Sequence, residues 1–202
     1  RPERSLEDDS TLSPASRIVQ AGRQLFFEKG FQNVSTDMLA KEAKVSKQSI
    51  YKYFGDMSAV LVAVTEAESE NFFSPTPITI DSLETLEAEL VRFGTALMQF
   101  LNREEIIRFV QLMYEQARAN NDAASKFYDA AYGSSQTYLA ELIEQGQTLG
   151  VVTQALTANE LAMQLLGMWE FIPMVRVQMA KRTKPFSSPK AWAEKCVKTL
   201  LF

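Results

Sequence analysis

The chain has 202 residues, of which 46% are hydrophobic and 23% charged, with a net charge of −4; this is an ordinary globular composition. Its single cysteine, Cys196, excludes a disulfide within the chain, and the absence of histidine excludes the common zinc sites and histidine-dependent nucleophiles. No apolar run approaches the roughly 20 residues that a membrane-spanning helix needs. Composition therefore argues against an enzyme and a membrane partner, and it predicts a cytoplasmic protein without a metal or other cofactor.

Charge is unevenly distributed along the chain. Residues 17–54 carry seven Lys/Arg against three Asp/Glu, a net charge of +4, whereas residues 55–202 carry 12 against 18, a net charge of −6. A basic segment on an acidic body can attract nucleic acid. From charge alone, a solvated surface is the simpler interpretation.

Hydrophobic periodicity predicts helices almost throughout and no strand, and so an all-α fold. In the first half it predicts one helix over residues 16–29 and a longer one over residues 57–73. Between them, Ser35 and Ser46 have the side chains preferred at helix N-caps and precede two short helices. The segment therefore reads as a three-helix unit followed by a connecting helix.

A proline-containing break at residues 74–81 separates this unit from a second half. Thr157 and Glu160 there have the spacing of a capping box, and Pro173 lies inside a predicted helix, which it should kink. The helices expected in this half span residues 82–101, 103–119, 123–149, 157–181 and 189–201. The predicted organisation is a flexible N-terminal arm (1–14), a helix-turn-helix domain (15–56), a connecting helix (57–73) and a larger helical bundle (74–202).

The two short helices are the informative part of the sequence. Ala40, Val45 and Ile50 are spaced so that the second helix can cross closely over the first, as in a helix-turn-helix. Spacing alone leaves this reading and a plain helical hairpin about even. The residue types favour the first, because "RIVQAGRQLFFEKGFQNVSTDMLAKEAKVSKQSIYKYFGDMSAVL" (residues 17–61) resembles the DNA-binding domain of the tetracycline-repressor (TetR) family of bacterial transcription regulators.

The helix after Ser46 has a face suited to DNA. With Ile50 and Phe54 directed inward, its Lys and Gln side chains can reach base edges in the major groove, and its tyrosines can reach phosphates. The start of the preceding helix can offer hydroxyl and N–H groups to another phosphate. Together with the resemblance, this predicts that Lys47, Gln48 and Ser49 read bases, within a DNA-binding set of Ser35, Thr36, Lys44, Lys47, Gln48, Ser49, Tyr51, Lys52 and Tyr53. For Tyr53, packing against the first helix is an alternative.

Three positions depart from the pattern that the resemblance implies, and the first is Val34, which replaces a frequent threonine. Lys44 stands where the family usually has glycine, so a left-handed backbone there would cost about 1 kcal/mol. Met57 stands where a lysine commonly contacts phosphate. We expect Lys44 and Lys52 to restore the lost positive charge near DNA.

The resemblance further implies a homodimer that binds palindromic operator DNA and pairs through its last two long helices. Candidate interface residues are Leu161, Leu165, Met168, Ala193, Val197 and Leu200, although the sequence does not separate an interface from a core. Large side chains of the bundle can line a pocket for a mostly apolar small-molecule effector; they are Phe93, Met98, Phe109, Met113, Tyr114, Phe127, Tyr138 and Trp169. For any one of them a core position is the simpler interpretation.

The function expected from these features is a ligand-responsive transcriptional repressor that is not an enzyme. It would be a bacterial cytoplasmic protein, associated with the nucleoid when bound to its operator and released by its effector. Two other classes stay open. One is a helical small-molecule-binding or enzymatic protein without DNA-binding activity, and the other is a helical scaffold for protein partners.

Overall fold

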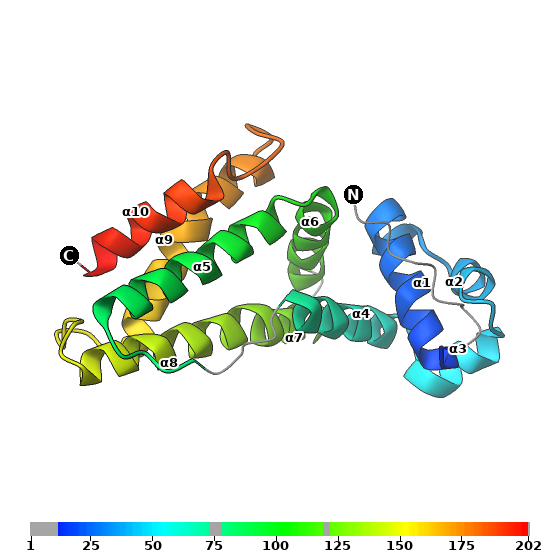
Figure 1. Ribbon diagram of the computed structural model, residues 1–202. Helices are drawn as coiled ribbons and strands as arrows, with labels where there is room; N and C mark the ends of the chain where they lie inside the picture. Colours follow the sequence, from blue (N-terminus) through cyan, green and yellow to red (C-terminus); the bar gives the residue numbers. More distant parts are fainter. Residues whose placement is uncertain (1–11, 73–77, 119–121, 202) are drawn as a thin grey trace. The chain divides into compact units, whose positions relative to one another are not determined.

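The computed structural model describes residues 12–72, 78–118 and 122–201 (Figure 1). Within these ranges the chain is helical and has no strand, as the periodicity predicts. None of the helices in the described ranges is long and apolar enough to cross a membrane. Most of the expected arm (1–14) and the first part of the 74–81 break lie outside the described residues.

The chain divides into two compact units. The N-terminal unit comprises the residues up to 68 together with residues 108–127, and the C-terminal unit comprises residues 69–107 and the residues from 128 onward. This division differs from the sequence-based one, since residues 108–127 group with the N-terminal unit. Their apolar pattern continues that of the bundle helices, so periodicity alone could not reveal this grouping.

The N-terminal unit is built on a long first helix. Its elements are α1 (Pro14–Lys29), a 3-10 turn η1 (Phe31–Asn33), α2 (Thr36–Glu42), α3 (Lys47–Phe54) and the start of α4 (Met57–Phe72). Gly22 lets α4 approach closely, because a Cβ there would lie 3.2 Å from side-chain atoms of both Val60 and Val64. Arg23 forms an ion pair with the buried carboxylate of Glu68, with Nη2 3.1 Å from Oε2. The close contact at Gly22 and the ion pair between Arg23 and Glu68 together fix α1 against α4.

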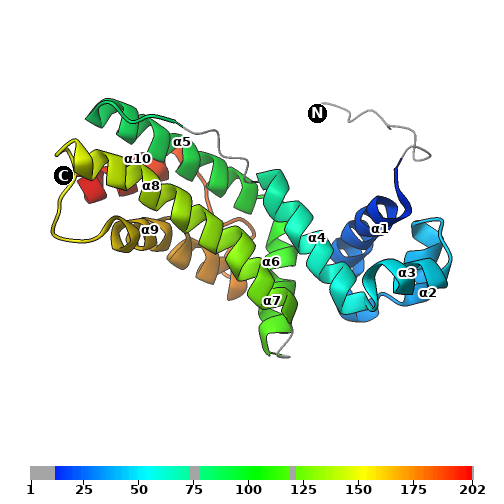
Figure 2. The ribbon, with the colours of Figure 1, turned by 90° about the horizontal axis from the view of Figure 1, so that it is seen from below.

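The C-terminal unit is a helical bundle in which α5, α8, α9 and α10 lie side by side (Figures 1 and 2). The elements after α4 are α5 (Leu83–Leu101), α6 (Glu104–Arg118), α7 (Asp122–Phe127), a π-helical turn η2 (Tyr128–Gly133), α8 (Ser134–Thr148), α9 (Ala158–Gln178) and α10 (Pro189–Leu201). One close approach is between α5 and α9. A Cβ at Gly94 would lie 2.5 Å from the ring of Trp169, so only glycine fits under this fully buried indole.

One predicted helix is interrupted. Periodicity predicted a continuous helix over residues 123–149, but η2 lies between α7 and α8. A π-turn is wider than an α-helical turn and is a rare local insertion, which the 3.6-residue period of an α-helix does not anticipate. The sequence pattern therefore does not reveal it.

The predicted capping box of α9 is confirmed. The backbone N–H of Glu160 donates to Thr157 Oγ1 over 3.2 Å, and that of Thr157 donates to Glu160 Oε2 over 2.8 Å. The helix ends at Gln178 rather than near 181, because Ala180 adopts a left-handed conformation with φ 53°. Its neighbour Lys181 closes the end by donating to the carbonyl of Arg176 over 2.8 Å.

Candidate nucleic-acid interface

Two serine caps define the short helices α2 and α3. Ser35 Oγ accepts from the backbone N–H of Met38 over 3.2 Å, and Ser46 Oγ accepts from that of Ser49 over 3.1 Å. Each hydroxyl satisfies an N–H group that the first helical turn leaves without a partner. Both predicted caps are therefore confirmed.

The turn between the helices is left-handed at Lys44, with φ 52°. Lys44 N donates to the carbonyl of Lys41 over 3.2 Å, and Val45 N donates to that of Ala40 over 3.0 Å. This pair of bonds is the Schellman ending, in which glycine is the usual residue. Arg17 Nη1 of α1 lies 3.5 Å from the Lys44 carbonyl oxygen, which ties the turn to the first helix. The left-handed conformation expected from the sequence is thus present despite the lysine side chain.

The inward face of the two helices is apolar and tightly buried. Leu39 and Ile50 are fully buried, and Ala40 and Ala43 are nearly so. Phe54, which we expected inward, is half-buried. Because α3 buries the side that carries Ile50, its opposite side faces outward and its orientation is fixed by this packing.

The outward face presents most of the expected DNA-binding side chains. Tyr51 is 53% exposed and Tyr53 47% exposed, so about half of each side chain is accessible. Thr36 and Ser49 are half-buried, and the Ser49 hydroxyl lies 2.9 Å from that of Ser46. The remaining members of the set are all exposed: Ser35, Lys44, Lys47, Gln48 and Lys52.

Lys47 makes a contact that the sequence analysis did not foresee. Its Nζ lies 2.7 Å from Oδ1 of Asp37 in the first turn of α2, and both side chains are exposed. The hydrogen bond from the Lys47 ammonium to Asp37, together with the negative charge of Asp37, raises the pKa of Lys47. The expected base-reading lysine is therefore joined to a carboxylate in the free protein.

The expected pocket residues separate between the two units. In the C-terminal unit, the Phe93 ring lies 5.4 Å from that of Tyr138 and 6.2 Å from that of Trp169, between centroids, and Met98 is fully buried. In the N-terminal unit, the Phe109 ring lies 5.4 Å from that of Phe127, and Met113 is buried. Tyr114 is 56% exposed and therefore does not belong to the interior.

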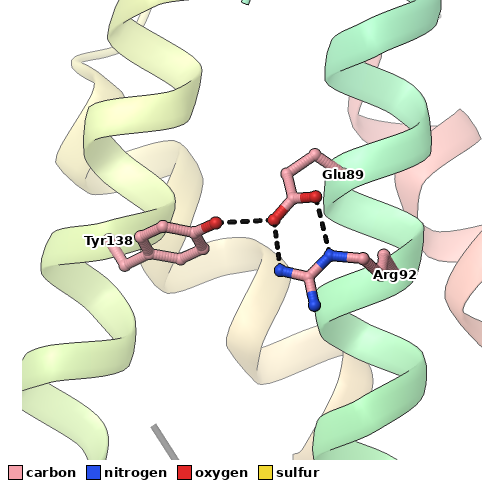
Figure 3. Close-up of polar contacts among 3 residues, drawn as sticks. All are labelled: Glu89, Arg92 and Tyr138. Carbon is pink, nitrogen blue, oxygen red and sulfur yellow. Dashed lines mark hydrogen bonds and ion pairs between the residues drawn. The ribbon is translucent and has the colours of Figure 1, made fainter. Parts of the chain in front are cut away.

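A partly buried ionic cluster, in which Glu89 and Tyr138 are buried and Arg92 is exposed, accompanies the aromatic residues of the C-terminal unit. Figure 3 shows the Tyr138 hydroxyl of α8 and the Arg92 guanidinium of α5 both directed at the Glu89 carboxylate, with hydrogen bonds of 2.5 and 2.7 Å from Tyr138 Oη and Arg92 Nε. Hydrogen bonding from Arg92 lowers the pKa of Glu89 even though burial opposes it. Burial and the contact with Glu89 raise the pKa of Tyr138 to about 12. Nothing in the periodicity pointed to this cluster, because Glu89 and Tyr138 are 49 residues apart.

The expected dimer residues lie mostly in the core of the protomer. Leu165, Ala193 and Val197 are fully buried and Leu161 is 3% exposed, whereas Met168 and Leu200 are half-buried. A side chain that is already buried loses no accessible surface on association, so the first four are core residues rather than interface residues. The apolar side chains that α9 and α10 do expose are Met163, Phe171, Ile172 and Trp192.

Phe171, Ile172 and Trp192 border a groove of about 710 Å³ between the end of α9, the following loop and α10. Its lining includes Met168, Phe171, Ile172 and Trp192. Trp192 is fixed there, because its Nε1 donates to the carbonyl of Met168 over 3.2 Å. The C-terminal unit thus has an apolar face on the two helices that the resemblance implicates in pairing.

A left-handed turn between two capped short helices, with a polar and basic outer face and a separate helical bundle, defines a helix-turn-helix transcription regulator. Residues 18–64 match the family described as "Bacterial regulatory proteins, tetR family", and residues 88–201 match the "AefR-like transcriptional repressor, C-terminal domain". The chain belongs to the TetR family of bacterial transcription regulators, as the sequence predicted.

Individual relatives agree with this assignment. The transcriptional repressor SCO4008 of Streptomyces coelicolor is 24% identical over 153 residues, which are 76% of this chain and 74% of that protein. The uncharacterised regulator YdeS of Bacillus subtilis is 34% identical over 94 residues, which are 44% of this chain and 42% of that protein. A TetR regulator from Agrobacterium tumefaciens shares the fold with a TM-score of 0.77, 22% identity and 94% coverage of both chains. The family and these relatives are transcription regulators, not enzymes.

Proposed function

We propose that the protein is a repressor that binds a palindromic operator as a homodimer, with α3 of each protomer in the major groove. The observation that carries the proposal is the exposed face of α3 opposite the fully buried Ile50. Gln48 can pair with adenine and the Lys47 ammonium with guanine, while Tyr51, Lys52 and Tyr53 reach phosphates. Two such heads spaced by about one helical turn of DNA would require a palindrome.

Selection of bound sequences from random duplex DNA tests this proposal. The purified wild-type chain should enrich a palindrome, and Tyr51→Phe should weaken operator binding through loss of a phosphate contact. Ser58→Ala on α4, outside the expected DNA-binding set, is the matched hydroxyl control. Recovery of no enriched palindrome with the wild-type chain would refute operator binding.

Dimerisation is assigned to the exposed apolar face of α9 and α10. Phe171 is 64% exposed and Trp192 40% exposed, and both line one groove with Ile172; a contiguous exposed apolar surface of this kind is typical of a protein–protein contact. Burying them against a second copy would remove apolar surface at about 25 cal/mol per Å². Phe171→Glu should therefore shift the protein to a monomer in sedimentation analysis, whereas Met179→Glu, at the exposed residue just after α9, should not.

We place the binding site of the effector in the interior of the C-terminal unit. Trp169 Nε1 is buried and has no hydrogen-bond partner among the residues that the structure describes. An unsatisfied buried donor is costly, so a mostly apolar effector with a carbonyl or carboxylate oxygen would gain a hydrogen bond there. Release from DNA requires that the effector bind the non-binding conformation more tightly; affinity alone would change nothing.

Thermal-shift screening identifies such an effector. Trp169→Phe keeps the ring but removes the N–H group, and it should weaken binding about tenfold, which corresponds to a hydrogen bond of roughly 1.4 kcal/mol. Trp192→Phe is the matched control and should leave effector affinity unchanged. Equal effects of the two variants would contradict this assignment.

A further inference from the structure

The contact between Asp37 and Lys47 places a negative charge within the surface expected to face DNA. Asp37 belongs to the first turn of α2, and Lys47 is the first residue of α3. Both side chains are exposed, at 73% and 54%, and the carboxylate oxygen lies 2.7 Å from the ammonium nitrogen. A carboxylate on this surface would repel the phosphates of bound DNA and so weaken binding.

The pair changes what Lys47 can do. A lysine ammonium on its flexible stem contacts any nearby phosphate, which adds affinity for every DNA sequence alike. Bound to Asp37, the ammonium is held at one position, and one of its three N–H groups is occupied. The other two can donate to the O6 and N7 acceptors of one guanine.

Asp37 adds a second recognition element at the same place. Its other oxygen, Oδ2, can accept a hydrogen bond from the N4 amino group of a cytosine. A carboxylate beside an ammonium presents an acceptor and a donor together, which fits the major-groove edges of a G·C step. The same carboxylate repels phosphate, so it disfavours positions of α3 in the groove that would place Asp37 beside the DNA backbone.

We propose that Asp37 is a specificity-determining residue of the reading head, which acts by holding Lys47 toward the bases and away from the phosphates. The proposal rests on the operator binding proposed above. It assigns to α2 a part in sequence discrimination, in addition to its part in supporting α3.

Removing the charge of Asp37 tests this inference. Asp37→Asn should free Lys47 to contact phosphate in both protomers. The slope of log affinity for random duplex DNA against log salt concentration should then steepen by about 1.8, or about 0.9 for each protomer. The ratio of operator affinity to random-DNA affinity should fall about tenfold for each half-site. Glu42→Gln is the matched control, because it removes one exposed acid from the other end of the same helix.

A double-mutant cycle separates positioning from a general effect of charge. If Asp37 acts mainly by holding Lys47, most of the effect of Asp37→Asn on the affinity ratio should disappear in a Lys47→Ala background, and the remainder measures the contact of Asp37 itself with cytosine. Circular dichroism of each variant establishes that the chain is folded.

The outcomes distinguish a failure of the proposed role of Asp37 from a failure of the proposed operator binding. Equal effects of Asp37→Asn and Glu42→Gln, or an undiminished effect of Asp37→Asn without Lys47, would overturn the role of Asp37 while operator binding stands. Failure of the wild-type chain to enrich any palindrome would overturn both.

Discussion

Replacing Lys44 by glycine measures the strain of the left-handed turn. At φ 52° an L-residue brings its Cβ close to the backbone, at about 1–2 kcal/mol, and glycine avoids this cost. Glycine also has more freedom in the unfolded chain, which offsets about 0.5–1 kcal/mol of the gain. The backbone hydrogen bonds of the turn do not involve the side chain. We therefore expect Lys44→Gly to raise the free energy of unfolding by about 0.5–1 kcal/mol, which corresponds to a rise in Tm of roughly 1–4 °C.

The chain supplies its own control. Ala180 follows α9 with nearly the same backbone conformation, φ 53°, but it lies in the C-terminal unit. Thermal unfolding of Ala180→Gly should show a similar gain, with no change in DNA binding. Lys44→Ala removes the charge and keeps the left-handed strain, so it should lack the gain in stability.

DNA binding gives the second measurement. If both copies of Lys44 contact phosphate, Lys44→Gly and Lys44→Ala should each flatten the salt slope of operator binding by about 1.8. A fall in stability for Lys44→Gly, with the gain at Ala180→Gly retained, would refute the account of strain. An unchanged slope in both Lys44 variants would refute the phosphate contact.

Three further predictions concern the C-terminal unit. Gly94→Ala should lower the free energy of unfolding by about 1–3 kcal/mol, because its Cβ would lie 2.5 Å from the Trp169 ring; Gly133→Ala, whose Cβ would meet its nearest neighbour at 3.8 Å, is the control, and equal losses would contradict the packing argument. Thr157→Ala should cost about 1 kcal/mol through loss of the cap, and Thr157→Ser should recover most of it in the same melts. Burial raises the pKa of Glu170 from 4.5 to about 8, so between these values the folded chain retains a proton that the unfolded chain loses. Stability should accordingly fall as pH rises through this window, by up to about 1.4 kcal/mol per pH unit. Glu170→Gln should remove that slope in denaturant unfolding measured from pH 5 to 8, and an unchanged slope would exclude Glu170 as its source.

Local signals in the sequence predicted local structure well. Ser35, Ser46 and Thr157 act as caps because a cap needs only the side chain and the next three residues. The left-handed conformation at Lys44 was expected from the resemblance, because the family usually has glycine at this position, and the structure has it with φ 52°. The exposed face of α3 follows from the inward position of Ile50.

Features that depend on which faces meet in space were not predictable. Both α9 and α10 have apolar residues on two sides, so periodicity could not tell that Leu165 and Val197 lie inside while Phe171 lies outside. The partner of Lys47 was missed for the same reason. Asp37 is ten residues away on another helix, and its direction depends on the crossing of α2 and α3.

Side-chain partners also change how the charge of the N-terminal segment should be read. Residues 17–54 carry a net charge of +4, but Arg23 is paired with Glu68 and Lys47 with Asp37. Two other lysines of the expected DNA-binding set, Lys44 and Lys52, are exposed and are predicted to contact phosphate, which gives four such contacts per dimer. With about 0.9 per contact, these lysines predict a salt-slope contribution near 3.6, whereas counting Lys47 as well predicts about 5.4. Salt titration of operator binding from 50 to 200 mM, compared between the wild-type chain and a Lys44→Ala/Lys52→Ala variant, isolates this contribution. A loss near 3.6 with a residual slope close to zero would mean that Lys47 contacts no phosphate, whereas a residual slope near 1.8 that disappears in Lys47→Ala would mean that it does.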